Sequence, residues 1–174
     1  MKPFVVLVAD LVHRPAARRA ERLRGPLAEA LEVTGTRAEA GAELAVDVVL
    51  EAVSDGVLAT GTAGVDWAAA CRRCLQPVAG RTEAEFRELY SEKPVEGETF
   101  PIAHESVDLE LVAREAILLD LPLAPLCREE CAGLCPTCGA DRNEGSCDCA
   151  PAASDPRWAA LDGLRAQLED RPEN

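Results

Sequence analysis

The amino-acid sequence predicts an α+β fold, in which an antiparallel β meander or small open barrel is packed by a long helix. A Cys-rich knuckle and a short final helix are expected after this core. Three observations carry the prediction. Residues 43–51 alternate between apolar and mostly polar side chains, as a half-buried strand does. Asp55-Gly56 follows and favours a hairpin turn. A wide apolar stripe with helical spacing occupies residues 109–117.

The N-terminal segment starts with a short apolar run at residues 4–8, which predicts a strand. Residues 15–24 are rich in arginine and are expected to form a short helix or loop. Two interpretations of this arm stay open, a solvated face or a local contact with RNA or a protein partner. The arginines assigned to that contact are Arg14, Arg18, Arg19 and Arg22.

Two further strands are expected after the hairpin turn. Apolar residues share one face from Val57 to Trp67, and Gly61 and Gly64 indicate a bulge or bend in that strand. The next strand is expected over residues 78–90. The Cys-Arg-Arg-Cys sequence between the two strands therefore lies at the tip of a second hairpin.

A loop and a helix complete the core. Residues 91–105 carry two prolines and no periodicity, so a loop is expected there. Ser106 and Asp108 offer N-caps to the helix that follows, and Pro122 ends it.

The eight cysteines fall into four close pairs. Thiolates with this spacing bind zinc at tetrahedral sites, and four pairs fill two sites, so two zinc ions are expected. Pro136 and Gly139 fit a zinc knuckle, because proline fixes one turn dihedral and glycine permits a positive φ. The pairs are Cys71/Cys74, Cys127/Cys131, Cys135/Cys138 and Cys147/Cys149.

The residues alone leave open which pairs share an ion. Chain order places the first two pairs on one zinc and the last two on the other, whereas a rival partition joins the second and third pairs. Disulfides are the alternative to metal, but they need an oxidising compartment that nothing else in the sequence indicates. Arg72 and Arg73 either offset the negative charge of a tetrathiolate site or contact RNA.

The charge and hydropathy of the chain limit its partners. The 174 residues carry a net charge of −13, which repels phosphate backbones and suits a basic protein partner. The N-terminal apolar run is too short for a secretory signal, and no segment approaches the ~20 apolar residues of a membrane span. A cytoplasmic location with reduced thiols is therefore expected, with no membrane and no small-molecule substrate.

Several motifs resemble those of the YceD family, which is known for large-subunit ribosomal RNA accumulation. They are Cys71-Arg-Arg-Cys-Leu-Gln-Pro, Ala-Ile-Leu-Leu-Asp-Leu-Pro-Leu-Ala-Pro-Leu-Cys, Cys-Ala-Gly-Leu-Cys-Pro-Thr-Cys-Gly and Asp155-Pro-Arg-Trp-Ala-Ala-Leu. The likeness extends in order over residues 57–168. Some members of that family keep the first Cys pair and a later Cys or His pair but lack the last four cysteines. The resemblance therefore favours the partition by chain order.

The resemblance implies a role in large ribosomal subunit biogenesis, and the four cysteine pairs add that the protein is a non-enzymatic zinc-binding one. It is expected to support accumulation of the large-subunit (23S) ribosomal RNA by binding a ribosomal protein or ribosome precursor, with local contact to the RNA. Three parts of the chain are expected: an α+β core with its N-terminal arm (1–126), a Cys-rich zinc-binding segment packed on that core (127–150), and a C-terminal helix with a frayed tail (151–174). The final helix is expected over residues 156–168, after Asp155 as N-cap.

Two rival functions remain. A redox-sensitive zinc chaperone combines C-x-C with C-x2-C, although in the reverse order and with a longer spacer than here. A thiol-disulfide enzyme would use Cys71 and Cys74, whose neighbouring arginines favour the thiolate. Other catalysis is not expected, because neither His13 nor His104 lies in a catalytic constellation and two filled tetrahedra leave no open zinc position.

Overall fold

A computed structural model of the chain describes residues 3–12, 14, 16–149, 156–158 and 161. The chain forms two compact units, the first Met1–Cys131 and the second Ala132–Asn174. This boundary lies inside the Cys-rich segment 127–150 that the sequence treats as one piece. Cys127 and Cys131 belong to the first unit, and their sulfur atoms gather with those of Cys71 and Cys74.

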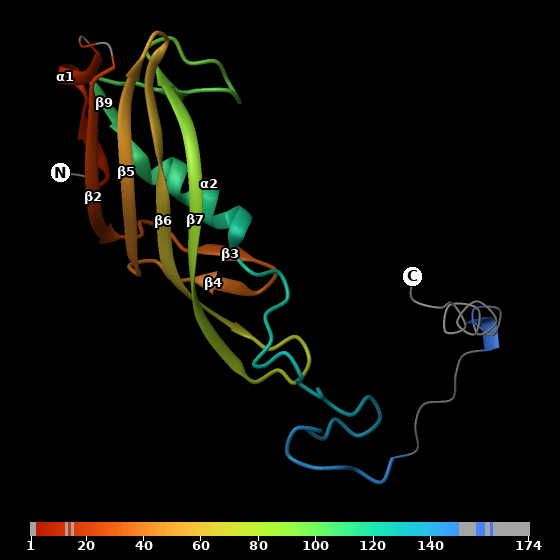
Figure 1. Cartoon of the computed structure of the whole chain (residues 1–174). Helices are drawn as coiled ribbons and strands as arrows, with labels where there is room; N and C mark the ends of the chain where they lie inside the picture. The colour runs from red at the N-terminus through yellow and green to blue at the C-terminus, as the bar shows by residue number, and fades with distance from the viewer. Residues whose placement is uncertain (1–2, 13, 15, 150–155, 159–160, 162–174) are drawn as a thin grey trace, which may run out of the picture. The chain divides into compact units, whose positions relative to one another are not determined.

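The first unit is built on a mostly antiparallel open sheet (Figure 1). Its neighbouring strands run in the order β2-β5-β6-β4-β3, while β7 pairs with β6 on the other side and with β8 at one end. β1 and β9 form a separate antiparallel pair. The strands are β1 (Val5–Leu7), β2 (Arg18–Pro26), β3 (Leu31–Val33), β4 (Thr36–Ala38), β5 (Glu43–Val53), β6 (Gly56–Ala70), β7 (Pro77–Ser91), β8 (Phe100–Pro101) and β9 (Ser106–Asp108).

Three consecutive strands, β5, β6 and β7, form the expected antiparallel meander. β5 buries every second side chain over most of its length, as the alternation in residues 43–51 predicts. The chain turns at Ser54-Asp55 and returns along β6, so the predicted hairpin is confirmed. β7 covers the predicted strand at 78–90. Sequence alternation and turn chemistry therefore locate this part of the fold.

The Arg-rich arm does not form the helix or loop that the sequence predicts. Residues 18–26 form the strand β2, which pairs with nine consecutive residues of β5. The prediction is wrong because this strand has few apolar residues. Its side chains alternate between half-buried and exposed, but most of them are charged, so the sequence shows no alternation of apolar and polar residues. Arg19 and Leu23 are half-buried on one face, whereas Arg18 and Arg22 are exposed on the other. Pairing with the long β5 decides the conformation here.

Gly61 and Gly64 do not mark a bulge. β6 keeps an unbroken register with β5 from Ala45↔Gly64 to Val53↔Gly56, and with β7 from Val57↔Tyr90 to Ala70↔Pro77. Gly61 has another reason to lack a side chain. A Cβ there would collide with the Asp47 carbonyl oxygen and would lie 2.8 Å from the Val48 Cα. At Gly64 the nearest atom would be the end of the flexible Arg81 side chain, at 2.8 Å.

The two glycines therefore give a matched pair of substitutions. Gly61→Ala is expected to lower the free energy of unfolding by about 1–3 kcal/mol, because the β5 backbone must move. Gly64→Ala is expected to change it by less than about 0.5 kcal/mol, because a side chain can turn away. Urea denaturation of both variants measures the difference. Equal losses in the two would show that strand propensity, and not close approach to β5, governs this strand.

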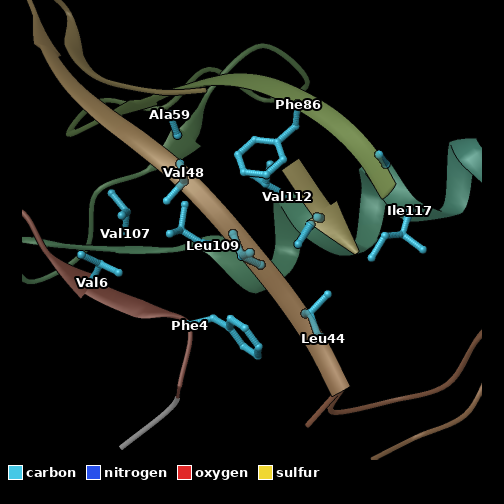
Figure 2. Packing of buried hydrophobic residues seen from close by; sticks show 14 of the residues in the cluster. Phe4, Val6, Leu44, Val48, Ala59, Phe86, Val107, Leu109, Val112 and Ile117 are labelled. Atoms are coloured by element: carbon cyan, nitrogen blue, oxygen red, sulfur yellow. The ribbon is translucent and has the colours of Figure 1, made fainter. Parts of the chain in front are cut away.

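The helix α2 (Leu109–Asp120) lies across one face of the sheet, the face that carries the buried apolar side chains (Figure 1). It begins after Asp108, whose side chain accepts a hydrogen bond from the Glu110 N–H at 3.0 Å, as the capping prediction requires. Its 12 residues make three turns, so it is of ordinary length. A shorter helix, α1 (Ala9–Val12), follows β1. Figure 2 shows side chains of the strands, of α2 and of the residue before β1 in one cluster: Phe4, Val6, Leu44, Val48, Ala59, Phe86, Val107, Leu109, Val112 and Ile117.

The second unit has little regular structure in its described residues. An isolated bridge joins Leu134 and Asp141, and a 3-10 turn occupies Pro156–Trp158. Most of the helix predicted over residues 156–168 lies outside the described residues. In the part of the chain that the structure describes, no helix has the length and apolar character that crossing a membrane requires.

Candidate metal centres

The first cysteine group consists of Cys71, Cys74, Cys127 and Cys131. Cys71 and Cys74 lie in the connection between β6 and β7, and Cys127 and Cys131 lie in the segment that follows α2. Three of the four side chains are buried, and only Cys127 is exposed. The group therefore joins two segments that are far apart in the sequence.

The sulfur positions in this group fit a tetrahedral metal site. All four sulfur atoms lie within 4.8 Å of one another. The Sγ atoms of Cys71 and Cys131 are 3.8 Å apart, and those of Cys74 and Cys127 are 3.6 Å apart. A zinc ion with Zn–S bonds of about 2.3 Å holds its sulfurs about 3.8 Å apart along each tetrahedral edge. The same separations are too long for disulfide bonds, which measure about 2.05 Å.

Hydrogen bonds that do not involve sulfur hold the two segments of the first group in place. The Arg72 N–H donates to the Pro125 carbonyl oxygen at 2.9 Å. The Arg73 guanidinium donates to the carbonyl oxygens of Glu129 and Cys131, both at 3.0 Å. The Thr36 hydroxyl donates to the Pro122 carbonyl oxygen at 2.6 Å, just after α2. The four cysteines are therefore held together without relying on sulfur contacts alone.

The thiols of the first group differ in acidity. The Cys74 N–H donates to the Cys71 sulfur and, with other backbone amides, lowers the pKa of Cys71 to about 6. The Gln76 N–H lowers the pKa of Cys74, but burial and the neighbouring thiols outweigh it and raise this pKa to about 12. Burial also raises the pKa of Cys127. Four thiolates at this distance repel one another, so a central cation is what would let all of them ionise.

The second cysteine group consists of Cys135, Cys138, Cys147 and Cys149, and its sulfur atoms also lie within 4.8 Å of one another. The Cys138 and Thr137 N–H groups lower the pKa of Cys135 to about 5. The Cys138 thiol and burial raise the pKa of Cys149 to about 12. The second group thus repeats the divided acidity of the first.

Both groups are built on the same backbone knuckle. The Cys135 N–H donates to the Ala140 carbonyl oxygen at 2.8 Å, and the Gly139 N–H donates back to the Cys135 carbonyl oxygen at 2.9 Å. In the first group, the Cys71 N–H donates to the Gln76 carbonyl oxygen at 2.8 Å, and the Leu75 N–H donates back to the Cys71 carbonyl oxygen at 2.9 Å. The residue after the second cysteine has a positive φ in each, 75° at Gly139 and 62° at Leu75.

The sequence identifies only one of these knuckles, because Leu75 stands where glycine is expected. A non-glycine residue with positive φ is uncommon, and leucine has a side chain that makes it costly. The C-x2-C spacing that the pair Cys71/Cys74 shares with Cys135/Cys138 is the sequence signal that could have identified the first knuckle. Leu75 is also 65% exposed, so no burial of its side chain offsets the strain.

The arginines proposed for RNA or partner contact are divided by the structure. Those of β2 face acidic partners within the chain: Arg18 with Glu51 at 3.2 Å, Arg19 with Asp10 and Glu21, both at 2.8 Å, and Arg22 with Asp47 at 3.8 Å. Arg73 is engaged beside the first cysteine group. Arg14 and Arg72 are exposed and have no side-chain partner among the described residues. Much of the positive charge of the arm is thus balanced locally.

The histidines show no arrangement with other reactive side chains in the described residues. His104 lies in an exposed turn with φ 51°, and His13 lies outside the described residues.

Comparison with known protein families gives the sequence a context. Residues 59–165, which contain all eight cysteines, match the sequence profile described as "Large ribosomal RNA subunit accumulation protein YceD". Uncharacterized proteins of Mycobacterium bovis and Mycobacterium tuberculosis are each 36% identical over 177 aligned residues, covering 91% of this chain and 80% of the relative. No solved structure matches.

A plant protein carries the family's description in its name. The "Large ribosomal RNA subunit accumulation protein YCED homolog 1, chloroplastic" of Zea mays is 29% identical over 116 residues, covering 47% of this chain and 40% of that protein. The profile match extends over more than half of the sequence, from β6 through α2 and both cysteine groups. The chain belongs to the YceD family of large ribosomal RNA subunit accumulation proteins.

Proposed function

We propose that this chain is a non-enzymatic, cytoplasmic zinc protein of large ribosomal subunit biogenesis. In this role it binds a basic ribosomal protein or a ribosome precursor and so supports accumulation of the large-subunit RNA. Family membership supports the process. The observation that carries the zinc assignment is the sulfur spacing of 3.6–3.8 Å in the first cysteine group.

Each zinc ion has a structural role in this proposal. Cys71, Cys74, Cys127 and Cys131 hold the first ion, and Cys135, Cys138, Cys147 and Cys149 hold the second. Four thiolates complete a tetrahedron, so neither ion keeps a position for water or substrate. Bound zinc neutralises much of the negative charge on the sulfurs and converts its binding energy into folding energy.

The thiol-disulfide alternative is disfavoured by access to the sulfur. A low pKa at Cys71 suits a nucleophile, but this side chain is 0% exposed. A redox nucleophile must reach its partner's disulfide, so reactive cysteines are at least partly exposed. The backbone amides that lower the pKa of Cys71 suit a metal thiolate equally well.

Charge supports a basic protein partner over naked RNA. The net charge of −13 repels phosphates. The β2 arginines form ion pairs with acidic side chains of the same unit, which balance much of their positive charge. RNA contact is then restricted to a few exposed arginines, among them Arg14, Arg18, Arg22 and Arg72.

The test combines metal analysis with capture of the partner. Elemental analysis of protein purified without chelator is expected to give about two zinc ions per chain. Affinity capture from native lysate, with and without RNase, is expected to enrich large-subunit precursors or a basic large-subunit protein. Metal-free protein with eight titratable thiols contradicts the zinc assignment. A broad set of unfolded clients would instead support the redox-sensitive chaperone.

The two knuckles allow a conformational test of the second metal site. Gly139→Ala is expected to weaken zinc binding by the second group about tenfold, because an L-residue in the left-handed region costs about 1–2 kcal/mol. No atom lies within 4 Å of the added Cβ, so sterics outside the backbone do not contribute. Competition with a chromogenic chelator measures the affinity.

The control is Leu75→Gly in the first knuckle. It removes the same conformational strain and is expected to leave zinc retention by the first group unchanged or improved. Faster zinc loss from Leu75→Gly than from Gly139→Ala would show that the positive φ does not limit these sites.

A further inference from the structure

The outer edge of β7 is long and unpaired. β7 pairs with β6 from Pro77 to Tyr90, but with β8 only at Tyr90 and Ser91. From Pro77 to Leu89 the strand therefore has no second neighbour among the described strands. Every other residue of an antiparallel strand directs its N–H and C=O away from the existing partner, so these groups face outward along the edge. The uninterrupted register with β6 leaves no bulge to block a new strand.

The helix α2 provides an apolar surface beside this edge. α2 packs against β6 and β7, and its buried side chains are Leu109, Val112, Ala113 and Ile117. It crosses behind β5, β6 and β7, and its C-terminal end continues past β7 (Figure 1). A strand added about 4.8 Å from β7 would lie over that part of the helix.

The C-terminal end of α2 offers an exposed apolar side chain beside the β7 edge. Earlier turns of the helix are engaged elsewhere, since Glu110 accepts from the Ala28 N–H and Arg114 donates to the Glu29 carbonyl oxygen. Leu119, in the last turn, is 89% exposed. Glu115, one turn before it, contributes with Glu88 to the raised pKa of Tyr90 on β7.

The charges around the edge favour a basic occupant. Glu83 and Glu85 are exposed on the outer face of β7, and Glu88 and Glu115 lie on the helix side. Of the basic residues on the strand, Arg81 pairs with Asp66 at 3.0 Å and with Glu83 at 3.4 Å, which leaves Arg87 as an exposed cation. A second copy of this acidic chain suits the edge less well than a basic segment does.

We propose that β7 accepts an extended basic segment of a protein partner as an added strand. The segment alternates apolar and basic side chains, with its apolar side chains toward the C-terminal end of α2 at Leu119 and its basic side chains near Glu83 and Glu85. Main-chain hydrogen bonds supply affinity, and the two faces supply selectivity. This inference rests on the proposed function for the basic character of the partner and adds the surface and the conformation in which the partner binds.

The experiment uses the full chain and a synthetic probe, an end-blocked decapeptide of alternating lysine and valine. Two control peptides carry N-methyl groups, one on every valine and the other on every lysine. In an added strand only one of these residue sets donates to β7, so one control is expected to lose binding and the other to keep it. Fluorescence anisotropy measures the three affinities. Binding by electrostatic attraction alone would leave both controls equal and would overturn the proposal.

Hydrogen exchange and variants locate the probe. Amides between residues 79 and 89 are expected to exchange roughly tenfold more slowly when the probe is bound. The variant Leu119→Ser is expected to weaken binding roughly fivefold, because one apolar contact is lost. Leu7→Ser, at a leucine that is 59% exposed on β1, is the control and is expected to bind within about twofold of the original chain.

Three outcomes reject the proposal: no binding of the probe, protection outside β7, or protection of β7 that rises with protein concentration before any probe is added. The last would mean that a second copy occupies the edge. No ribosomal component is present in this experiment. A negative result therefore removes the added strand, while the capture from lysate decides the proposed function separately.

Discussion

Replacing Cys74 with serine is expected to lower the melting temperature by roughly 15 °C or more, because the proposed metal of the first unit would lose a ligand. Cys74 is buried, and its sulfur lies 3.6 Å from that of Cys127, 53 residues along the chain. A metal at this point joins the β6–β7 connection to the segment after α2, and so closes a long loop of the unfolded chain. Thermal melting followed by circular dichroism measures the loss.

The matched control is Cys149→Ser in the second cysteine group. That group spans only residues 135–149, and the regular structure within the described residues 132–149 is limited to an isolated bridge. We expect the variant to increase amide exchange within residues 132–149 and to leave the melting of the first unit nearly unchanged. Equal global unfolding of the two variants would show that the groups do not differ in this way.

The parts of the fold that the sequence predicts are those in which a local pattern and the tertiary environment agree. β5 alternates because one face meets the core, and Ser54-Asp55 supplies its turn. α2 begins where Asp108 caps it. In each case the residues that set the local conformation are also the residues that the fold buries or turns.

The missed elements depend on contacts that the sequence does not display. β2 has charged residues at most positions, and only its pairing with β5 makes it a strand. The short strands β3 and β4 pair around Thr34-Gly35, where Thr34 has φ 49° and its hydroxyl donates to the Leu123 carbonyl oxygen. This hydrogen bond ties the short hairpin to a segment almost 90 residues away, which no local window contains.

For the candidate metal centres, the sequence predicts the ligands but not how they are grouped. Close pairs of cysteines predict metal ligands wherever they occur, because thiolate chemistry needs only the residue type and the spacing. Their grouping is a tertiary property, and the residues alone left two partitions open. The sulfur atoms gather in chain order, with Cys131 in the first group and Cys135 in the second. The turn geometry at Leu75 could not be predicted, since the residue itself disfavours it.

The final prediction concerns the choice between a protein and an RNA partner. The purified chain is expected to bind a basic large-subunit ribosomal protein more tightly than bare ribosomal RNA, because a net charge of −13 attracts the first and repels the second. Binding to the protein is expected to weaken at least tenfold between roughly 0.05 M and 0.5 M salt, since complementary charges are screened. Separate titrations of the two components over this range measure both affinities.

A triple variant separates the two kinds of contact. Replacing Arg18, Arg19 and Arg22 with alanine is expected to reduce any residual RNA binding and to leave the protein complex intact, because basic side chains position phosphates but do not attract a basic partner. Arg19 also bridges β2 to Asp10 and to the Leu7 carbonyl oxygen, so circular dichroism must first show that the variant is folded. Arg72→Ala, at an exposed arginine outside β2, tests whether RNA contact lies at the first cysteine group instead. Tight binding of bare RNA that survives the triple substitution would contradict the argument from charge. It would mean that the arginines of β2 contribute nothing to RNA binding. It would also mean that the acidic surface does not repel the phosphates.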